Sequence, residues 1–323
     1  MKGEEKQRVS PSSVADSVAI SYATLSKRLR LFAVFAALLC LAFIVPLIGL
    51  VRLSITQALH SHIPLIPVIS AYLIWLKRRE IPLNPTGSPA LAAILFAIGL
   101  VALNAYIATG LAGTPRPVTD SVAAGIFAFV CFLWGGALLL LGASVLKPIA
   151  FPVAFLIFMV PMPTFVVETI EVFLQHASAE AAALIFWITG STVFRDGLVF
   201  QLPGITIQVA EECSGIRSTY VLFITSLLAG HLLLHSSWRR ALLALFVIPL
   251  GILRNGFRVY TIGWLCVHIS PTMIDSPIHR RGGPLFFVLS LIPLFLLLVW
   301  LYRAERRGAE RQASKGAGAD SAP

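Results

Sequence analysis

Three short polar segments interrupt an otherwise apolar chain, and each carries side chains that could do chemistry. Residues 211–218 hold a thiol beside two glutamates, residues 253–258 hold two arginines and an asparagine, and residues 276–283 hold a histidine. A thiolate is a nucleophile, and imidazole is the usual proton carrier near neutral pH. An ionisable group inside a membrane segment is by default a functional hypothesis. These three segments are therefore the candidates for a reactive site.

The thiol of Cys213 comes just before an apolar run that predicts a helix. The positive end of the helix dipole would lower its pKa, and Arg217 one turn on would help. Glu211 and Glu212 would oppose this effect unless they pair with arginines. Two other interpretations stay open: Cys213 is a small filler in a structural turn, or it forms a disulfide with Cys266.

The second segment places Arg254, Asn255 and Arg258 inside the apolar run 241–268. A charged residue near the bilayer centre costs about 2.5–3.5 kcal/mol on insertion scales, so two arginines require acidic partners or a polar cavity. Four residues apart, they share one helix face. Alternatives are that they extend toward the outer headgroups, or that they form a structural pair with the acidic residues before Cys213.

The third segment holds His279, followed by Gly282-Gly283, which would let the chain turn tightly into the next helix. A lone loop histidine is more often simply solvated, and this alternative stays open. His231 and His235 have metal-ligand spacing but no third ligand. The sequence lacks the H-E-x-x-H, phosphate-loop, dinucleotide and serine-elbow patterns. We therefore predict no cofactor and no metal ion.

Composition defines the elements that must position these groups. The 323 residues are 57% hydrophobic and 12% charged, with a mean hydropathy of +0.86. Soluble chains carry about 25% charged residues, so a cytosolic enzyme, a fibre and a disordered chain are excluded. The net charge of +10 comes from residues beside apolar runs, not from one basic face, so no nucleic-acid partner is predicted.

A membrane helix needs about 20 apolar residues. We therefore predict an all-α polytopic membrane protein with about eight transmembrane helices. The predicted spans are 31–51, 61–76, 89–109, 121–143, 148–163, 216–236, 241–268 and 284–302. With both termini in the cytoplasm, most of the 25 lysines and arginines fall on the cytoplasmic side, as the positive-inside rule requires. The three polar segments then meet at the outer face.

The longest predicted external piece combines a helix with a β-ribbon. Residues 164–189 predict a helix at the outer surface, with a re-entrant or ninth spanning segment as alternatives. Residues 193–212 predict a short ribbon, because Asp196-Gly197 is a hairpin signal and Pro203-Gly204 marks another turn. Unpaired strands cannot lie in the hydrocarbon core, so the ribbon should lie outside it.

The order of three motifs resembles the exosortase/archaeosortase family. They are AEECSGIRS (210–218), RNGFR (254–258) and HRRGG (279–283), and the resemblance covers about residues 30–302. It implies a membrane-embedded cysteine peptidase and transpeptidase. By resemblance the catalytic residues are Cys213, Arg258 and His279, and the supporting residues are Arg254, Asn255, Arg217, Glu211 and Glu212. Archaeal relatives usually have Arg at the third position, so His279 looks like the bacterial form.

The resemblance also implies the partners and the location. The substrates would be membrane-tethered exported proteins with a C-terminal sorting signal of the PEP-CTERM type: a short motif, a hydrophobic helix and a basic cluster. The acyl acceptor would be a lipid or glycan, or water for plain proteolysis. The enzyme would lie in the lipid of the bacterial inner membrane with its site facing the periplasm. Residues 1–30 and 303–323 would be disordered cytoplasmic tails around the transmembrane domain 31–302.

Two functions from other classes remain possible on the sequence. A transporter or flippase could use Arg254 and Arg258 to bind an anionic lipid or sugar phosphate, although no internal repeat is visible. A scaffold for exopolysaccharide assembly would need none of the thiol, guanidinium and imidazole groups together. A transporter should tolerate Cys213→Ser, whereas a transpeptidase should not.

Overall fold

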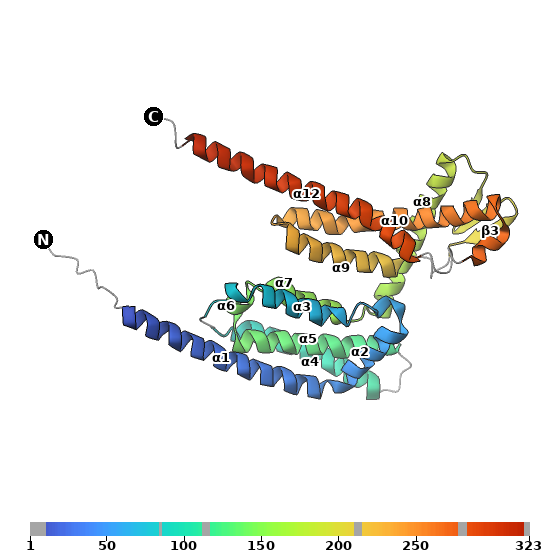
Figure 1. Cartoon of the computed structure of the whole chain (residues 1–323). Helices are drawn as coiled ribbons and strands as arrows, with labels where there is room; N and C mark the ends of the chain where they lie inside the picture. Colours follow the sequence, from blue (N-terminus) through green and yellow to red (C-terminus); the bar gives the residue numbers. More distant parts are fainter. Residues whose placement is uncertain (1–10, 84–85, 112–116, 210–214, 277–282, 320–323) are drawn as a thin grey trace. The chain divides into compact units, whose positions relative to one another are not determined.

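A computed structural model describes residues 11–83, 86–111, 117–209, 215–276 and 283–319. It divides into two compact units, Met1–Thr164 and Phe165–Pro323 (Figure 1). Helices dominate both units, and one small antiparallel sheet lies in the second. The all-α membrane fold predicted from the sequence is thereby confirmed, together with its β-ribbon.

The first unit is built around one central helix, α5. Its side chains Ile126, Val130 and Cys131 are almost fully buried, because α1, α2 and α4 all pack against it. The helices are α1 (Pro11–Ala42), α2 (Ile44–Thr56), α3 (Leu65–Leu76), α4 (Pro89–Leu111), α5 (Val118–Leu140), α6 (Ala143–Leu146) and α7 (Ala150–Phe155), with single 3₁₀ turns at Ala58–His60, Arg78–Glu80 and Leu156–Met159.

The membrane spans follow the sequence prediction with two corrections. Six helices of the described chain are each long and apolar enough to cross a bilayer, and up to eight spans result if each of two bent pairs counts as one. The first pair, predicted as a single helix 31–51, bends by 73° at Phe43. Pro46 explains this break, because a proline ring clashes with the carbonyl four residues earlier, here Ala42.

The second bent pair joins Ala150–Met159 to helix α8 (Thr164–Ile188) at an angle of 90°. The sequence predicted one span over 148–163, but only its first part is helical. Pro161 and Pro163 end it, because proline removes a backbone donor and disfavours helix in the residue before it.

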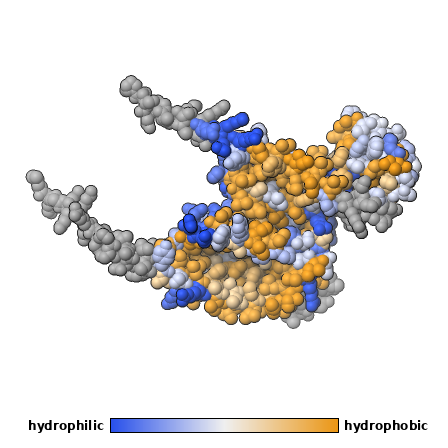
Figure 2. Space-filling model, viewed as in Figure 1, coloured by the Kyte–Doolittle hydropathy of each residue, from blue (hydrophilic) through white to orange (hydrophobic). Residues whose placement is uncertain are grey.

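The apolar side chains of the spans face outward as well as inward. Leu41, Ile55 and Val101 in the first unit, and Trp187 in the second, are among many large apolar side chains left exposed. Figure 2 shows the helical surfaces as mostly hydrophobic (orange). Such extensive exposed apolar surface fits contact with lipid, since soluble monomers rarely expose large apolar patches.

The second unit places three helices side by side and joins one of them to the sheet. Helix α10 packs against both α9 and α12 (Figure 1). Its Leu243 and Val247 are fully buried among leucines of the two neighbours. The elements after α8 are β1 (Phe194–Asp196), β2 (Val199–Leu202), β3 (Ile205–Gln208), α9 (Ile216–Leu233), α10 (Ser237–His268), a 3₁₀ turn (Pro271–Asp275) and α12 (Gly283–Ala319).

Helix α10 is much longer than its neighbour α9. At 1.5 Å per residue, the 32 residues of α10 extend about 48 Å and the 18 residues of α9 about 27 Å. A hydrocarbon core is about 30 Å thick. If the hydrocarbon core begins at Ser237, Arg254 and Arg258 would lie near its far boundary. Their place at the outer face of the membrane stays a prediction from the sequence, and these lengths are consistent with it.

The end of α10 beyond α9 packs against the β-ribbon and α8. Phe186 of α8 contacts Phe200 of β2 and Tyr260 of α10, with ring centroids 5.7 and 5.1 Å apart. Pairing of Asp196 with Val199 and of Leu202 with Ile205 confirms the two predicted turns. Gly197 and Gly204 adopt φ of 58° and 81° in these turns, a conformation that glycine adopts without strain.

Helix also covers part of both predicted tails. Helix α1 already begins at Pro11, inside the predicted disordered range 1–30, and α12 continues to Ala319, inside 303–323. The adjoining apolar segments nucleate these helices, so each further residue adds a backbone hydrogen bond without a new nucleation step. The sequence reasoning treated low hydropathy as disorder and missed this continuation.

Candidate functional site

The described chain contains part of the predicted site. Arg254, Asn255 and Arg258 lie on α10, and Arg217 lies in the first turn of α9. The predicted residues Glu211, Glu212, Cys213 and His279 lie outside the described residues. The geometry of the site is therefore built from the elements that flank them.

Gly215 precedes helix α9 and has a left-handed backbone, with φ 75°. Its carbonyl accepts the first hydrogen bond of the helix from the Thr219 amide, at 3.0 Å. A Cβ atom at Gly215 would lie 2.9 Å from Nη2 of Arg254 and 3.3 Å from the amide of Asn255. Both the backbone conformation and the contact with α10 require glycine here.

Arg254 ties α10 to the start of α9. Its Nη2 donates to the Gly215 carbonyl at 3.1 Å and to Oγ1 of Thr219 at 3.2 Å. The residue is 8% exposed, and Nη1 is buried without a hydrogen-bond partner among the described residues. Gly251 permits the close approach, because a Cβ there would lie 2.6 Å from Thr219 Oγ1. A buried arginine of this kind does not fit the alternative of extension toward headgroups.

The opposite face of the same α10 turn lies against α8. A Cβ at Gly256 would lie 2.6 Å from Cβ of Ala181 and 2.9 Å from the Ala182 amide nitrogen. Asn255, between Arg254 and Gly256, is 2% exposed. The RNG sequence is therefore enclosed between the start of α9 and the middle of α8.

Arg258 lies one turn beyond Arg254 and is half-buried. Arg217 is exposed. The structure thus brings Arg254 and Asn255 to Gly215, whereas it leaves Arg217 at the surface. The catalytic role predicted for Arg258 stays a prediction.

Two residues at this site were missed by the sequence reasoning. Thr219 shares Arg254 with Gly215, and Gln175 of α8 is buried and donates to the Val209 carbonyl at 2.6 Å. Thr219 lies four residues after Gly215, and this spacing could have indicated from the sequence that the two lie on one face of the helix. Gln175 falls within the predicted surface helix 164–189, and its burial depends on the ribbon, to which it donates a hydrogen bond at Val209.

The alternative disulfide has a described candidate partner, Cys266. It is a free thiol and 1% exposed, on the part of α10 beyond α9. Cys40 and Cys131, both in the first unit, are free as well. The structure therefore lends no support to the disulfide interpretation.

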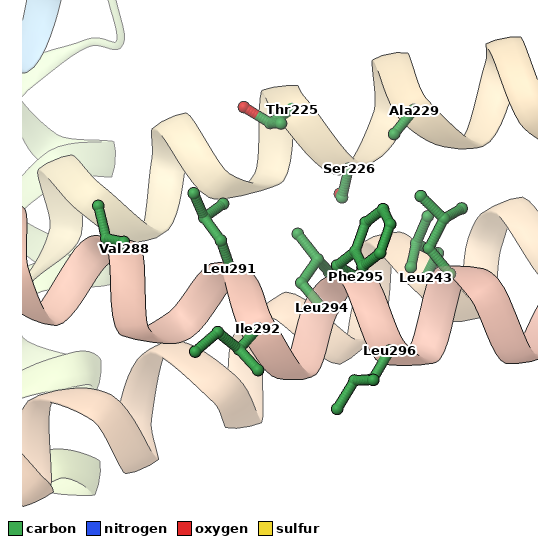
Figure 3. A pocket seen from close by; sticks show the side chains of 11 residues that line it. Thr225, Ser226, Ala229, Leu243, Val288, Leu291, Ile292, Leu294, Phe295 and Leu296 are labelled. Carbon is green, nitrogen blue, oxygen red and sulfur yellow. The ribbon is translucent and has the colours of Figure 1, made fainter.

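A cavity of about 500 Å³ lies between α9, α10 and α12 (Figure 3). Leu291 and Phe295 of α12 extend toward α9 across it. Thr225 and Ser226 also line it, but their hydroxyls donate to carbonyls of their own helix, Val221 at 2.8 Å and Phe223 at 2.7 Å. The cavity therefore presents apolar surface and no charged group to a ligand.

Outside the membrane helices, one ion pair links the ribbon to α8. Arg195 of β1 donates to both carboxylate oxygens of Glu180, at 2.9 and 2.7 Å, and its Nε donates to the Gly197 carbonyl at 2.8 Å. The hydrogen bonds to Glu180 raise the pKa of Arg195 above its usual value. The pair holds the first hairpin against α8.

The fold defines a polytopic membrane protein, in which a buried arginine lies beside the start of helix α9. The family model for the transmembrane exosortase matches residues 53–296. This match covers more than half of the chain and includes all three polar segments, so the protein belongs to the transmembrane exosortase family. No curated protein and no solved structure matches the chain.

Proposed function

We propose that this exosortase is a cysteine peptidase and transpeptidase that cleaves C-terminal sorting signals of the PEP-CTERM type. The observation that carries the proposal is the anchoring of Gly215 by Arg254, at 3.1 Å, within a family match that spans all three motifs. Cys213 is two residues before Gly215. Because a residue spans at most about 3.6 Å, the Cα atoms of Cys213 and Gly215 are within about 7 Å. This short separation supports a place for the thiol close to the buried arginine.

In the proposed reaction, Sγ of Cys213 attacks the carbonyl carbon of the scissile peptide bond, and His279 accepts the thiol proton. The carbonyl oxygen becomes an oxyanion, which the guanidinium of Arg258 stabilises. The tetrahedral adduct then collapses to a thioester. The C–N bond breaks, and His279 returns the proton to the leaving amine.

A second nucleophile then releases the substrate from the enzyme. An amine or hydroxyl of a lipid or glycan attacks the thioester carbonyl, and the thiol of Cys213 is regenerated. The exported protein is thereby re-anchored on the acceptor. If water attacks instead, the reaction is plain proteolysis.

The other site residues have supporting roles in the proposal. Arg254 donates to the Gly215 carbonyl and Asn255 lies against Gly215, so both would hold the start of α9, and the positive charge of Arg254 would favour the thiolate of Cys213. Arginine suits this place because its guanidinium stays protonated even when buried and donates several hydrogen bonds at once. Glu211, Glu212 and Arg217 would tune the charge around the thiol.

The proposed substrate is anchored in the same membrane, so enzyme and substrate meet within two dimensions. A high local concentration then makes weak recognition of a short motif sufficient. In the proposed topology the enzyme lies in the bacterial inner membrane with its site facing the periplasm. That orientation puts the ribbon and the start of α9 on the side to which the exported domains are delivered.

The proposal is tested by co-expression with a substrate that carries a C-terminal sorting signal. Cys213→Ala should abolish processing while membrane insertion is retained, and the matched control Cys40→Ser, at an exposed thiol of α1, should process normally. Mass spectrometry should detect a substrate thioester on Cys213 in the unmodified enzyme. Normal processing by Cys213→Ala would rule out covalent catalysis by this thiol.

The transport alternative gains no support from the cavity between α9, α10 and α12. Its lining offers only apolar groups and hydroxyls that are already bonded within α9. An anionic lipid headgroup or sugar phosphate would need cationic or free donor groups there. The same Cys213 experiment separates the two functions, since a transporter should remain active without the thiol.

A further inference from the structure

The segment that carries Cys213 is short, and both of its ends are attached to buried side chains. It runs from residue 210 to residue 214, between Val209 at the end of the ribbon and Gly215 at the start of α9. Each flanking residue has a backbone hydrogen bond of the sheet or helix, and each also accepts one hydrogen bond from a side chain. Two long polar side chains from different helices make the remaining contacts.

The first attachment is made by Gln175 of α8. Its Nε2 donates to the Val209 carbonyl at 2.6 Å, while the Val209 amide donates to the Leu198 carbonyl at 3.0 Å. Gln175 is 6% exposed and Val209 is 1% exposed. The last strand pair of the sheet is Val199 with Gln208, so the Val209 carbonyl lies just past the ladder. Without Gln175, a buried carbonyl would lose its donor.

The second attachment is made by Arg254 of α10. Its Nη2 donates to the Gly215 carbonyl at 3.1 Å, in addition to the helical bond from the Thr219 amide. This attachment also fixes where helix α9 begins.

The two side chains belong to one packed frame. Gly256 lets α10 contact the backbone of α8 at Ala182, and the rings of Phe186 and Tyr260 meet edge-on at 5.1 Å. Gln175 stands two helical turns before Ala182, on the same helix. The contact between α8 and α10 therefore fixes the positions of both donors relative to each other, Gln175 at Val209 and Arg254 at Gly215.

We propose that Gln175 and Arg254 are positioning residues for the acyl transfer, because they fix the carbonyls of Val209 and Gly215, the two described residues that flank the segment with Cys213. This inference rests on the proposed function, because it assigns Cys213 the attacking thiol. Neither side chain touches the substrate. Gln175 acts through the Val209 carbonyl, and Arg254 acts through the Gly215 carbonyl.

The experiment replaces Gln175 by Met, which keeps the length of the side chain and removes its donor. The matched control is Ser178→Ala, three residues on along α8. Ser178 is fully buried, and its hydroxyl has no hydrogen-bond partner among the described residues. Both variants are measured as full-length protein in membranes, for substrate processing and for the pH profile of thiol alkylation by N-ethylmaleimide, read by mass spectrometry.

We expect Gln175→Met to slow processing by about 10- to 100-fold, the range that misplacement of a reacting group can cost. The midpoint of Cys213 alkylation should shift to higher pH, because the thiol is no longer held at the start of α9. Cys266, 1% exposed in the same unit, should remain protected in the same sample. Ser178→Ala should match the unmodified protein within about twofold, since it removes no hydrogen bond of the frame.

The inference is overturned if Gln175→Met processes substrate and alkylates like the unmodified protein. It is also overturned if Cys266 becomes as reactive as Cys213, because the loss would then be general loosening of the unit. If the Met variant does not accumulate, Gln175→Asn decides, since its amide is one methylene too short to reach Val209. Retained processing by Cys213→Ala would defeat the proposed function, whereas the alkylation profile of Gln175→Met, in which Cys213 is present, tests separately whether Gln175 positions the thiol.

Discussion

Gly215 connects the start of α9 to polar side chains of α10, although it has no side chain of its own. The sequence predicted that a helix begins just after Cys213, and the structure has a left-handed glycine, Gly215, at the start of α9. It could not predict that Arg254 would reach its carbonyl. That contact depends on the register between α9 and α10, which the packing of many apolar side chains sets. Residue types therefore predicted a candidate site, but they could not predict which of its residues contact one another.

Substitution of Gly215 by Ala should impair processing for two reasons. The left-handed backbone costs a non-glycine residue about 1–2 kcal/mol, and the new Cβ would lie 2.9 Å from Nη2 of Arg254. Gly204→Ala is the matched control, since Gly204 has a similar φ of 81° and open space around it. We expect a loss of processing for Gly215→Ala well beyond that of the control, measured at equal protein levels. Equal losses would show that backbone strain alone matters.

Replacement of Arg258 by Lys should reduce processing about 100-fold or more, in keeping with loss of an oxyanion donor. An ammonium carries the same charge but lacks the planar set of donors. The rate of substrate cleavage in membranes measures the effect, with Arg303→Lys, an exposed position of α12, as the control. Near-normal cleavage by Arg258→Lys would show that only the charge is needed.

At the scale of elements, the sequence predicted where helices run better than where they bend or touch. Apolar runs gave the spans, and the hairpin signals gave the ribbon, because both patterns are local. The bend at Phe43 could have been read from Pro46, since the proline effect is local too. The contact of α8 with α10 could not be predicted from the sequence, because it joins Gly256 to alanines some 75 residues earlier.

That contact gives a prediction about stability. Gly256→Ala would place a Cβ 2.6 Å from Cβ of Ala181, and such overpacking typically costs about 1–3 kcal/mol. We expect a lower unfolding temperature in detergent, together with slower processing. Gly308→Ala on α12, where a Cβ meets nothing within 4 Å, should leave both unchanged. An unfolding temperature unaffected by Gly256→Ala would contradict close packing of α8 on α10.

The ion pair between the ribbon and α8 should contribute little. Glu180 is 72% exposed, and exposed pairs are worth about 0–1 kcal/mol. We expect Glu180→Gln to change the unfolding temperature only slightly, because Arg195 keeps its bond to the Gly197 carbonyl. Because the pair raises the pKa of Arg195, its contribution is lost in strong alkali when Arg195 loses its proton, and it is also lost in acid when the Glu180 carboxylate is protonated. A large drop in the thermal scan would mean that the pair fixes the ribbon.

At the scale of the whole molecule, composition alone established the membrane class. A chain with 12% charged residues cannot cover a soluble surface, and the exposed apolar helices agree with this conclusion (Figure 2). The helical extensions at both ends were missed, because helix propagation does not need apolar residues. The direction in which the chain crosses the membrane stays a prediction from its basic residues.

Cysteine labelling tests that direction in a background without native cysteines. Gly204→Cys in the ribbon should react with an impermeant maleimide added to spheroplasts, while Ser237→Cys at the start of α10 should react only after permeabilisation. Helix α9 separates the two positions and is long enough for one crossing. Labelling of both from outside would contradict the proposed orientation.

The overhang of α10 past α9 has a consequence for which bond is cut. The ribbon packs against this part of α10, and in the proposed function the thiol of Cys213 would lie beside it, at one distance from the membrane. In a substrate whose helix lies in the same membrane, the number of residues between that helix and a peptide bond would decide which bond reaches the thiol. Lengthening this spacer in a substrate should move the cut to a different bond, or prevent it, even with the recognition motif intact.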